Sequence, residues 1–265
     1  MSSKTLTIVH ASDVHLGDHL EDRLESFVEL THQIAPSLIV LTGDLTDGGR
    51  EEEYRLADAF LKRLPGPLFV VPGNHDAPVV DLIARFSVPY RRFRRLRGAT
   101  LDFRLPALSI ASLPTAKAVQ MRLDWSKGVA APEATHRALA TLPAGRQRRW
   151  RIIAGHHPLI DPPETTVTGD VLGGRMALEA ADRHGVDLSL AGHTHKSFIG
   201  RPSQDLDILL GIAPTLSSPR LRGEDQGFHC YTLLDDGLDC DVWRWRQGGF
   251  ALEKTISVGR RARHF

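Results

Sequence analysis

The sequence predicts an α/β fold in which two packed β-sheets are flanked by helices, and two features of the chain indicate it. Short apolar runs rich in β-branched residues recur with little polar alternation, as expected for strands buried on both faces. These runs are Leu6–Val9, Leu38–Leu41, Leu68–Val71, Leu108–Ala111, Arg151–Ala154 and Asp187–Leu190. The tail instead predicts consecutive strands with tight turns, at Asp207–Ile212, Phe228–Leu234, Asp239–Arg246 and Leu252–Val258.

Helical patterns lie between several of the predicted strands. They cover His19–Ile34, Glu51–Leu64, Val79–Phe86, Ala134–Leu142 and Met176–His184. The first two place apolar residues on one face, and the second also has an acidic first turn, which favours a helix N-terminus. An α/β half followed by a strand-rich half is typical of two sheets covered by helices. We expect one domain over residues 1–265, with an α/β part at 1–200 and a strand-rich part at 201–260.

Composition limits the classes of function. The chain has 265 residues, 42% of them hydrophobic, and a formal charge of +1, which gives no general argument for nucleic acid or membrane binding. No apolar run is long enough to span a bilayer, and the first residues lack a signal-peptide pattern. Cys230 and Cys240 flank a predicted turn at Asp236-Gly237, which puts them on opposite faces of a hairpin. We therefore expect free thiols in a cytoplasmic protein.

Polar side chains follow five of the predicted strands at the point where each strand ends. In chain order they are Asp13 and His15, Asp44, Asn74 and His75, His156 and His157, and His193 and His195. In open α/β sheets the ligand crevice lies at the carboxyl ends of the strands. If these strands share one sheet, residues spread between positions 13 and 195 converge on one site.

Glycines precede four of these polar clusters. Gly43, Gly73, Gly155 and Gly192 each stand directly before them. A glycine permits a sharp turn and the close approach of another group. An ordinary turn explains one such glycine, but the repeated layout favours a shared functional reason.

The residue types indicate a metal site. Asp13, His15, Asp44, Asn74, His156, His193 and His195 offer imidazole nitrogen and carboxylate or amide oxygen, which suit Mn, Fe or Zn. Seven ligands exceed one closed tetrahedral site and fit two ions that share a carboxylate. Two such ions clamp a phosphate and activate a hydroxide between them. The sequence therefore predicts two metal cofactors and a phosphorylated substrate.

The ordered motifs Asp13-Val14-His15, Gly43-Asp44, Gly73-Asn74-His75-Asp76, Gly155-His156 and Gly192-His193-Thr194-His195 carry a family resemblance. The chain resembles the calcineurin-like metallophosphoesterases, and it is most similar to their bacterial branch that contains the class III cyclic-nucleotide phosphodiesterases. The resemblance covers residues 13 to 195. It implies a four-layer αββα sandwich of two mixed β-sheets flanked by helices.

The resemblance also implies roles for matching residues. One metal would be held by Asp13, His15 and His195, the other by Asn74, His156 and His193, with Asp44 bridging them. His75 would be the catalytic residue that protonates the leaving oxygen or stabilises transition-state charge. His156 rather than His157 matches the ligand position, so His157 would line the site or pack beside it. Asp76 would either orient His75 or stabilise its turn.

The implied function is a dinuclear metal-dependent phosphoesterase acting on small phosphodiesters such as 3′,5′-cyclic nucleotides. On the same centre, a phosphomonoesterase, a nucleotide-sugar pyrophosphatase and a nuclease remain alternatives, and a non-enzymatic scaffold is a further one. A homodimer is also open, since related enzymes are often dimers. The five arginines of Tyr90–Gly98 form either a solvated basic surface or a device that steers an anionic substrate.

Overall fold

The part of the chain that the structure describes folds into two six-stranded β-sheets. The computed structural model describes residues 6–122, 124–143, 149–162 and 168–260. One sheet has the order β12-β11-β10-β1-β2-β3 and the other β4-β5-β6-β7-β9-β8, and each mixes parallel with antiparallel pairs. The strands are β1 (Leu6–Ala11), β2 (Leu38–Thr42), β3 (Leu68–Val71), β4 (Asp102–Leu105), β5 (Leu108–Ser112), β6 (Trp150–Ala154), β7 (Leu188–Ala191), β8 (Phe198–Gly200), β9 (Leu209–Ile212), β10 (Gly227–Leu233), β11 (Gly237–Arg246) and β12 (Gly249–Gly259).

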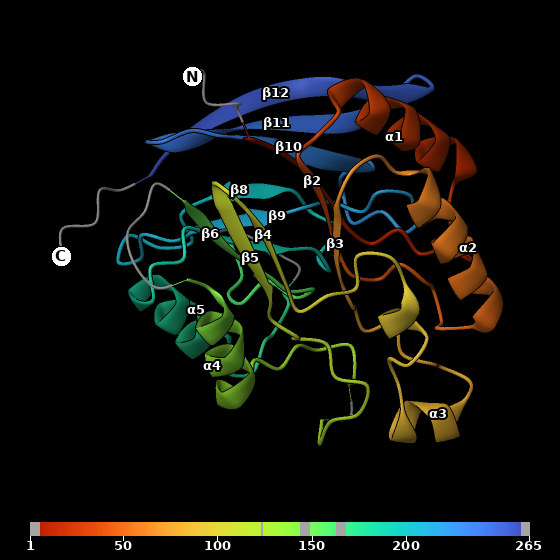
Figure 1. Cartoon of the computed structure of the whole chain (residues 1–265). Helices are drawn as coiled ribbons and strands as arrows, with labels where there is room; N and C mark the ends of the chain where they lie inside the picture. The colour runs from red at the N-terminus through yellow and green to blue at the C-terminus, as the bar shows by residue number, and fades with distance from the viewer. Residues whose placement is uncertain (1–5, 123, 144–148, 163–167, 261–265) are drawn as a thin grey trace.

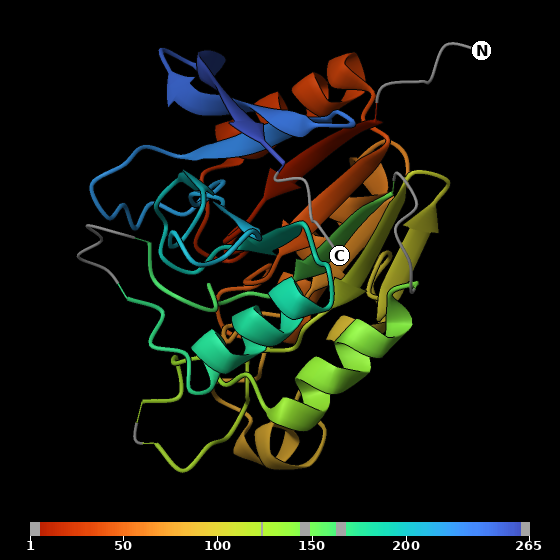
Figure 2. The ribbon, with the colours of Figure 1, turned by 90° about the vertical axis from the view of Figure 1, so that its left-hand side faces the viewer.

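Helices cover the outer face of each sheet. Figure 1 shows α1 and α2 on the side of the β1 sheet and α4 and α5 on the opposite side, and Figure 2 shows the same stack from the side. The helices are α1 (Glu21–Ile34), α2 (Glu51–Arg63), α3 (Leu82–Ser87), α4 (Pro132–Thr141) and α5 (Gly174–Arg183), with one 3₁₀ turn at Phe93–Arg95. The predicted sandwich of two mixed sheets flanked by helices is confirmed. Among the described residues no helix combines the length and apolar character needed to cross a membrane.

Apolar side chains on both faces of each central strand build the layers. In β2, Leu38 and Val40 join the core between the two sheets, whereas Ile39 and Leu41 join the core under α1 and α2. A third core, which includes Leu178, lies between the second sheet and α4 and α5. Strands buried on both faces have no polar side, which explains why the sequence shows so little alternation.

The motif-bearing strands do not share one sheet. β1, β2 and β3 lie in the first sheet, and β6 and β7 lie in the second. The tail completes the first sheet, because β10 pairs antiparallel with β1. Two strands escaped the sequence analysis for a physical reason. β4 is only half-buried with polar residues inside it, and β8 has three residues, so neither gives an apolar run.

The two cysteines are buried and free, as predicted. Cys230 packs in the core under the helices and Cys240 in the core between the sheets, so they lie on opposite faces of the sheet. The turn between them lies one residue earlier than predicted, because Leu233 pairs with Leu238. A two-residue turn keeps the same relation between the faces, so the shift leaves the prediction intact.

A chain of buried polar side chains crosses the space between the sheets. His10 Nε2 lies 2.9 Å from Thr42 Oγ1, and His10 Nδ1 lies 3.5 Å from the Tyr231 hydroxyl. That hydroxyl lies 2.9 Å from His229 Nδ1, and His229 Nε2 lies 2.6 Å from Ser197 Oγ. Burial lowers the pKa of His10 to about 3 and the pKa of His229 well below its usual value. Both imidazoles are therefore neutral in the folded protein near pH 7.

These neutral histidines predict a loss of stability in acid. Unfolded His10 binds a proton below pH 6.5, whereas the folded side chain stays neutral until about pH 3. This contribution to stability is complete above pH 6.5 and is lost as the pH falls towards 3. Between pH 7 and pH 5 we expect wild type to lose about 2 kcal/mol of unfolding free energy relative to His10→Gln. Chemical denaturation at both pH values measures this, and identical pH dependence in the two proteins would contradict it.

Candidate metal centre

The seven predicted metal ligands and His75 follow the carboxyl ends of five strands taken from both sheets. Asp13 and His15 follow β1, Asp44 follows β2, Asn74 and His75 follow β3, His156 follows β6, and His193 and His195 follow β7. Hydrogen bonds bring these loops together: Asp13 N–H donates to Gly43 O within the first sheet, Gly192 N–H donates to His156 O within the second, and His193 N–H donates to Asp13 Oδ2 across the two. The sheets therefore present one shared edge, although the strands do not share one sheet.

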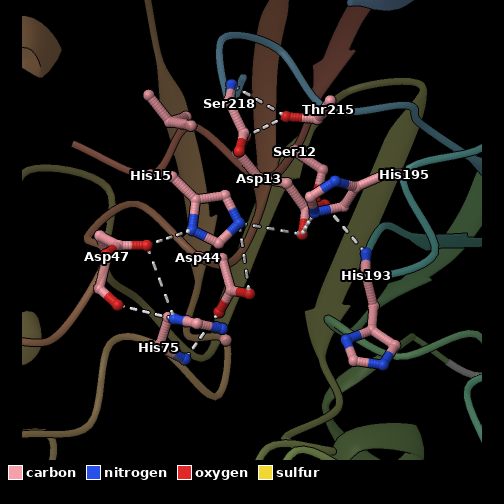
Figure 3. Close-up of polar contacts among 12 residues, drawn as sticks. Ser12, Asp13, His15, Asp44, Asp47, His75, His193, His195, Thr215 and Ser218 are labelled. Carbon is pink, nitrogen blue, oxygen red and sulfur yellow. Dashed lines mark hydrogen bonds and ion pairs between the residues drawn. The ribbon is translucent and has the colours of Figure 1, made fainter. Parts of the chain in front are cut away.

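The side chains of five predicted ligands lie close together. His195 Nε2 lies 3.2 Å and His15 Nε2 lies 3.9 Å from Asp13 Oδ1. Asp44 Oδ2 lies 3.2 Å from His156 Nε2 and 3.9 Å from His15 Nε2. Figure 3 shows Asp44 and Asp13 on the same side of the His15 ring. Asp44 is thus placed between the two groups of candidate ligands.

Among the described residues, four sets of three donor atoms lie close enough to hold an ion, and the one that is not fully buried is His15, Asp44 and His75. One set is Asp13, His15 and His195, and another is Asp13, Asp44 and His156; within each set the ligand atoms lie within 4.8 Å of one another. A third set joins His193 to His156 and His157. Every residue in these three sets is buried, which removes competing water.

Unsatisfied polar atoms test whether a metal fits. Asp13 Oδ1, His15 Nε2, Asn74 Oδ1 and His156 Nε2 are buried, and each lacks a hydrogen-bond partner among the described residues. Leaving one such atom unpaired costs about 1–3 kcal/mol, so a fold rarely tolerates several of them at one place. All four belong to predicted ligands. The nitrogen and oxygen donors fit cations such as Mn, Fe or Zn.

Hydrogen bonds on the far side of the imidazoles fix the ring tautomers. His156 Nδ1 lies 2.7 Å from Thr42 O, and His195 Nδ1 lies 2.9 Å from Arg220 O. A carbonyl oxygen only accepts, so each Nδ1 carries a proton and Nε2 is the ring nitrogen left to ligate a metal. Asp13 is oriented in the same way, because its Oδ2 accepts the His193 backbone N–H at 2.9 Å.

The Asp13 and Asp44 carboxylates are ionised in the folded protein. Burial alone would raise the pKa of Asp13 and of Asp44, but the nearby histidines outweigh it and hold both well below their usual range. Burial would lower the pKa of His156, yet Asp44, Asp13 and the Thr42 carbonyl raise it to about 9. A concentration of carboxylate charge that draws protons in this way also attracts cations.

The backbone at the site adopts an uncommon conformation. Five predicted ligands that are not glycine have positive φ: Asp13 (55°), His15 (53°), Asp44 (50°), His193 (67°) and His195 (56°). A side chain makes the left-handed region costly, and such strain gathers where function fixes the geometry.

The glycines before the ligands allow close approach, as the sequence predicted. A Cβ on Gly73 would lie 2.1 Å from Asp44 Oδ1, and one on Gly43 would lie 2.7 Å from His156 Nδ1. A Cβ on Gly192 would lie 1.8 Å from Ser12 Oγ. No larger residue fits at these positions without moving a candidate ligand or its neighbour.

His75 lies half-buried at the edge of the centre, and Asp76 does not orient it. The Asp76 carboxylate accepts hydrogen bonds from Gly73 N, Thr46 N and Thr46 Oγ1, so it stabilises the turn, which was one of the two predicted roles. Burial and nearby Asp44 raise the pKa of Asp76 to about 6. The bond that orients His75 comes from the carbonyl of Asp47, 2.6 Å from His75 Nδ1. His75 Nε2 therefore carries the ring's free lone pair or second proton.

Asp47 and Arg220 are residues that sequence reasoning missed. The Asp47 carboxylate lies 3.3 Å from His15 Nδ1 and pairs with Arg220. Its contact with His15 and the Arg220 charge lower the pKa of Asp47 to about 2, although burial opposes this. Asp47 is three residues after Asp44 and could have been found by that proximity. Arg220 belongs to no motif, so no sequence signal could have found it.

His157 packs beside the centre, as predicted. Its Nδ1 lies 3.1 Å from Thr115 Oγ1 and its Nε2 lies 2.7 Å from Ser126 O, so both ring nitrogens are engaged. The arginine run lies elsewhere. Arg91, Arg92 and Arg95 line a separate cavity against α2, which favours the predicted basic surface over a role at this centre.

The family model for the calcineurin-like phosphoesterases matches residues 6–197, which is more than half of the chain. The chain belongs to that family. The predicted resemblance is thereby confirmed, and the calcineurin-like phosphoesterases are hydrolases of phosphoric esters. The match ends just past His195, so it contains all eight predicted site residues.

Three proteins illustrate what this calcineurin-like phosphoesterase is similar to. A 3′,5′-cyclic-nucleotide phosphodiesterase of Nostoc sp. is 28% identical over 207 residues, which cover 73% of each chain. A probable glycerophosphodiester phosphodiesterase of Arcobacter nitrofigilis is 51% identical, but over only 41 residues, 16% of this chain and 15% of the relative. A dimetal phosphatase from Danio rerio has a TM-score of 0.69 at 14% identity, covering 98% of this chain and all of that one. The last likeness shows the fold.

The contact between Gly73 and Asp44 gives a test of the centre. In Gly73→Ala the new methyl group displaces the Asp44 carboxylate, and we expect Mn²⁺ affinity to fall roughly 10- to 100-fold, as for lost supporting contacts at other metal sites. Gly259→Ala is the matched control, because no atom lies within 4 Å of the added Cβ. Isothermal titration with Mn²⁺ measures both variants. Equal affinity of Gly73→Ala and wild type would show that Asp44 is not a ligand.

Proposed function

We propose that the chain is a dinuclear metal-dependent phosphodiesterase that hydrolyses small phosphodiesters, including 3′,5′-cyclic nucleotides. The observation that carries the proposal is the group of four buried ligand atoms without hydrogen bonds, three of which belong to overlapping sets of donor atoms within 4.8 Å of one another. The names of the similar Nostoc and Arcobacter proteins support a diester substrate.

The proposed ligands divide into two sets with one shared carboxylate. Asp13, His15 and His195 would hold one ion, and Asn74, His156 and His193 would hold the second. Asp44 would bridge them, since its Oδ2 lies within 4 Å of both His15 and His156. When bound, two such cations cancel part of the charge of the phosphodiester and lower the pKa of a coordinated water.

His75 supplies the proton chemistry that the ligands cannot. The Asp47 carbonyl accepts from Nδ1, which holds the ring and leaves Nε2 as the nitrogen that would meet the departing ester oxygen. Asp44 Oδ1 accepts the His75 backbone N–H at 2.8 Å, so the bridging carboxylate also fixes the position of the loop. His75 would therefore protonate the leaving alkoxide from a position set by two neighbouring loops.

Metal removal tests the proposal as a whole. We expect chelation to abolish hydrolysis of bis-p-nitrophenyl phosphate and added Mn²⁺ to restore it. A panel that adds p-nitrophenyl phosphate, cyclic AMP and a nucleotide-sugar separates a diesterase from a monoesterase or a pyrophosphatase. Turnover by fully metal-free protein would contradict the mechanism, and preference for the monoester would contradict the substrate class.

Replacement of His75 tests its role separately from metal binding. We expect His75→Ala to lower kcat by roughly 10²- to 10⁴-fold with unchanged Mn²⁺ affinity. The loss should be larger for cyclic AMP than for bis-p-nitrophenyl phosphate, because an alkoxide needs a proton more than a nitrophenolate does. His136→Ala, at an exposed position on α4, is the control. Equal losses on both substrates would assign His75 to charge stabilisation instead of proton transfer.

A further inference from the structure

A cavity of about 290 Å³ opens beside the candidate metal centre. It is lined by Asn74 and His75 together with Val79, Leu82, Arg85 and Trp125. Val79 and Leu82 are exposed and Trp125 is half-buried, so apolar surface faces solvent next to the proposed proton donor. The volume lies near the lower end of the range for small-molecule sites. The cavity therefore has the character of a binding site for one compact apolar group.

Helix α3 presents this apolar surface outwards. The sequence predicted a helix at Val79–Phe86, but α3 begins at Leu82 because the Asp81 side chain accepts the Ala84 N–H and caps it. Ile83 and Phe86 on this helix are exposed, and the buried residue is Arg85. This reverses the usual arrangement of a surface helix, in which the apolar face meets the core. Packing of the fold alone does not account for it.

Arg85 holds one side of the cavity in place. Its Nε donates to Ala118 O at 2.8 Å and its Nη1 donates to Pro78 O at 3.0 Å, so it joins the two chain segments that border the cavity. Its guanidinium carbon lies 5.1 Å from the Trp125 ring centroid, over the face of the ring. The Trp125 ring also meets the Phe86 ring edge-to-face, with the two ring centroids 5.9 Å apart. The indole is thus fixed in orientation.

His157 anchors the same segment from the metal centre. Its Nε2–H donates to the carbonyl of Ser126, the residue after Trp125, at 2.7 Å. A Cβ on Gly128 would lie 2.8 Å from His157 Cγ, so the segment runs tightly against the ring. Two contacts therefore fix the position of Trp125: the hydrogen bond from His157 to the neighbouring Ser126, and the packing of Arg85 over the indole.

We propose that Trp125 binds a planar aromatic group of the substrate, such as a nucleobase, by packing its indole against that group. The inference rests on the proposed phosphodiesterase function and specifies its substrate class: diesters with an aromatic ring system attached near the phosphorus. An indole fixed beside exposed apolar side chains offers the contact that stacked rings favour. Diesters with only small aliphatic groups would leave the cavity unfilled.

Binding of two product-like ligands to the Mn²⁺-loaded protein tests this proposal. AMP and ribose 5-phosphate share the sugar and the phosphate and differ only in the base. We expect wild type to bind AMP roughly 10- to 100-fold more tightly, the usual contribution of one base stacked on an aromatic side chain. Equal affinity of wild type for the two ligands would overturn the inference without any variant.

Two substitutions locate the effect at Trp125. We expect Trp125→Ala to bring the ratio of the two affinities close to one while ribose 5-phosphate affinity is unchanged, and Trp125→Phe to retain most of the ratio. Trp245→Ala is the matched control, because Trp245 also lies under an arginine, Arg23, and meets a phenylalanine edge, Phe250, on β11 and β12. An unchanged ratio in Trp125→Ala would overturn the inference.

The binding ratio does not depend on turnover, so the two proposals can fail separately. If Trp125→Ala loses the preference for AMP but wild type hydrolyses no diester, the proposed function is wrong and the aromatic site stands. If wild type hydrolyses diesters but binds AMP and ribose 5-phosphate equally, the proposed function stands and the aromatic site is wrong. Quenching of tryptophan fluorescence by AMP in wild type, absent in Trp125→Phe, is an independent readout of the same contact.

Discussion

One hydrogen bond between the two sheets sets the geometry on which the centre depends. The Asp13 carboxylate, at the end of β1, accepts the backbone N–H of His193 after β7 at 2.9 Å. It leaves the other Asp13 oxygen directed towards His15 and His195. The same contact therefore joins the sheets and orients a candidate ligand. Together with the bond between His156 Nδ1 and Thr42 O, this contact holds strand ends from both sheets beside one space.

The centre weakens the fold that carries it. Two buried carboxylates, unsatisfied ligand atoms and five side chains in left-handed backbone each raise the free energy of the native state. Three apolar cores offset this, and the strands that precede the ligands are buried on both faces. Such a trade between local strain and global packing is the usual pattern at functional sites. A bound cation would relieve part of the strain by satisfying the unpaired atoms.

Local signals in the sequence predicted the central strands, the helices and the group of converging residues. Each of these depends on neighbours in the chain: an apolar run, a glycine, then polar residues. The division of strands between sheets depends on pairing between distant segments, so no local pattern encoded that β10 joins β1. Asp47, Arg220 and Trp125 were missed because their roles come from contacts across the fold. The sequence predicted a helix in the region of α3, but it did not predict that the apolar side chains of this helix face solvent.

The pairing of β1 with β10 has a consequence for biosynthesis. His10 and Tyr231, neighbours across these strands, are separated by 221 positions in the chain. A nascent polypeptide leaving the ribosome exposes one edge of β1 until β10 has also been translated. Contacts of such long sequence separation fold slowly and leave apolar edges open to aggregation. Cotranslational protection by a chaperone would matter most for β1, which directly precedes the aspartate that the centre is built around.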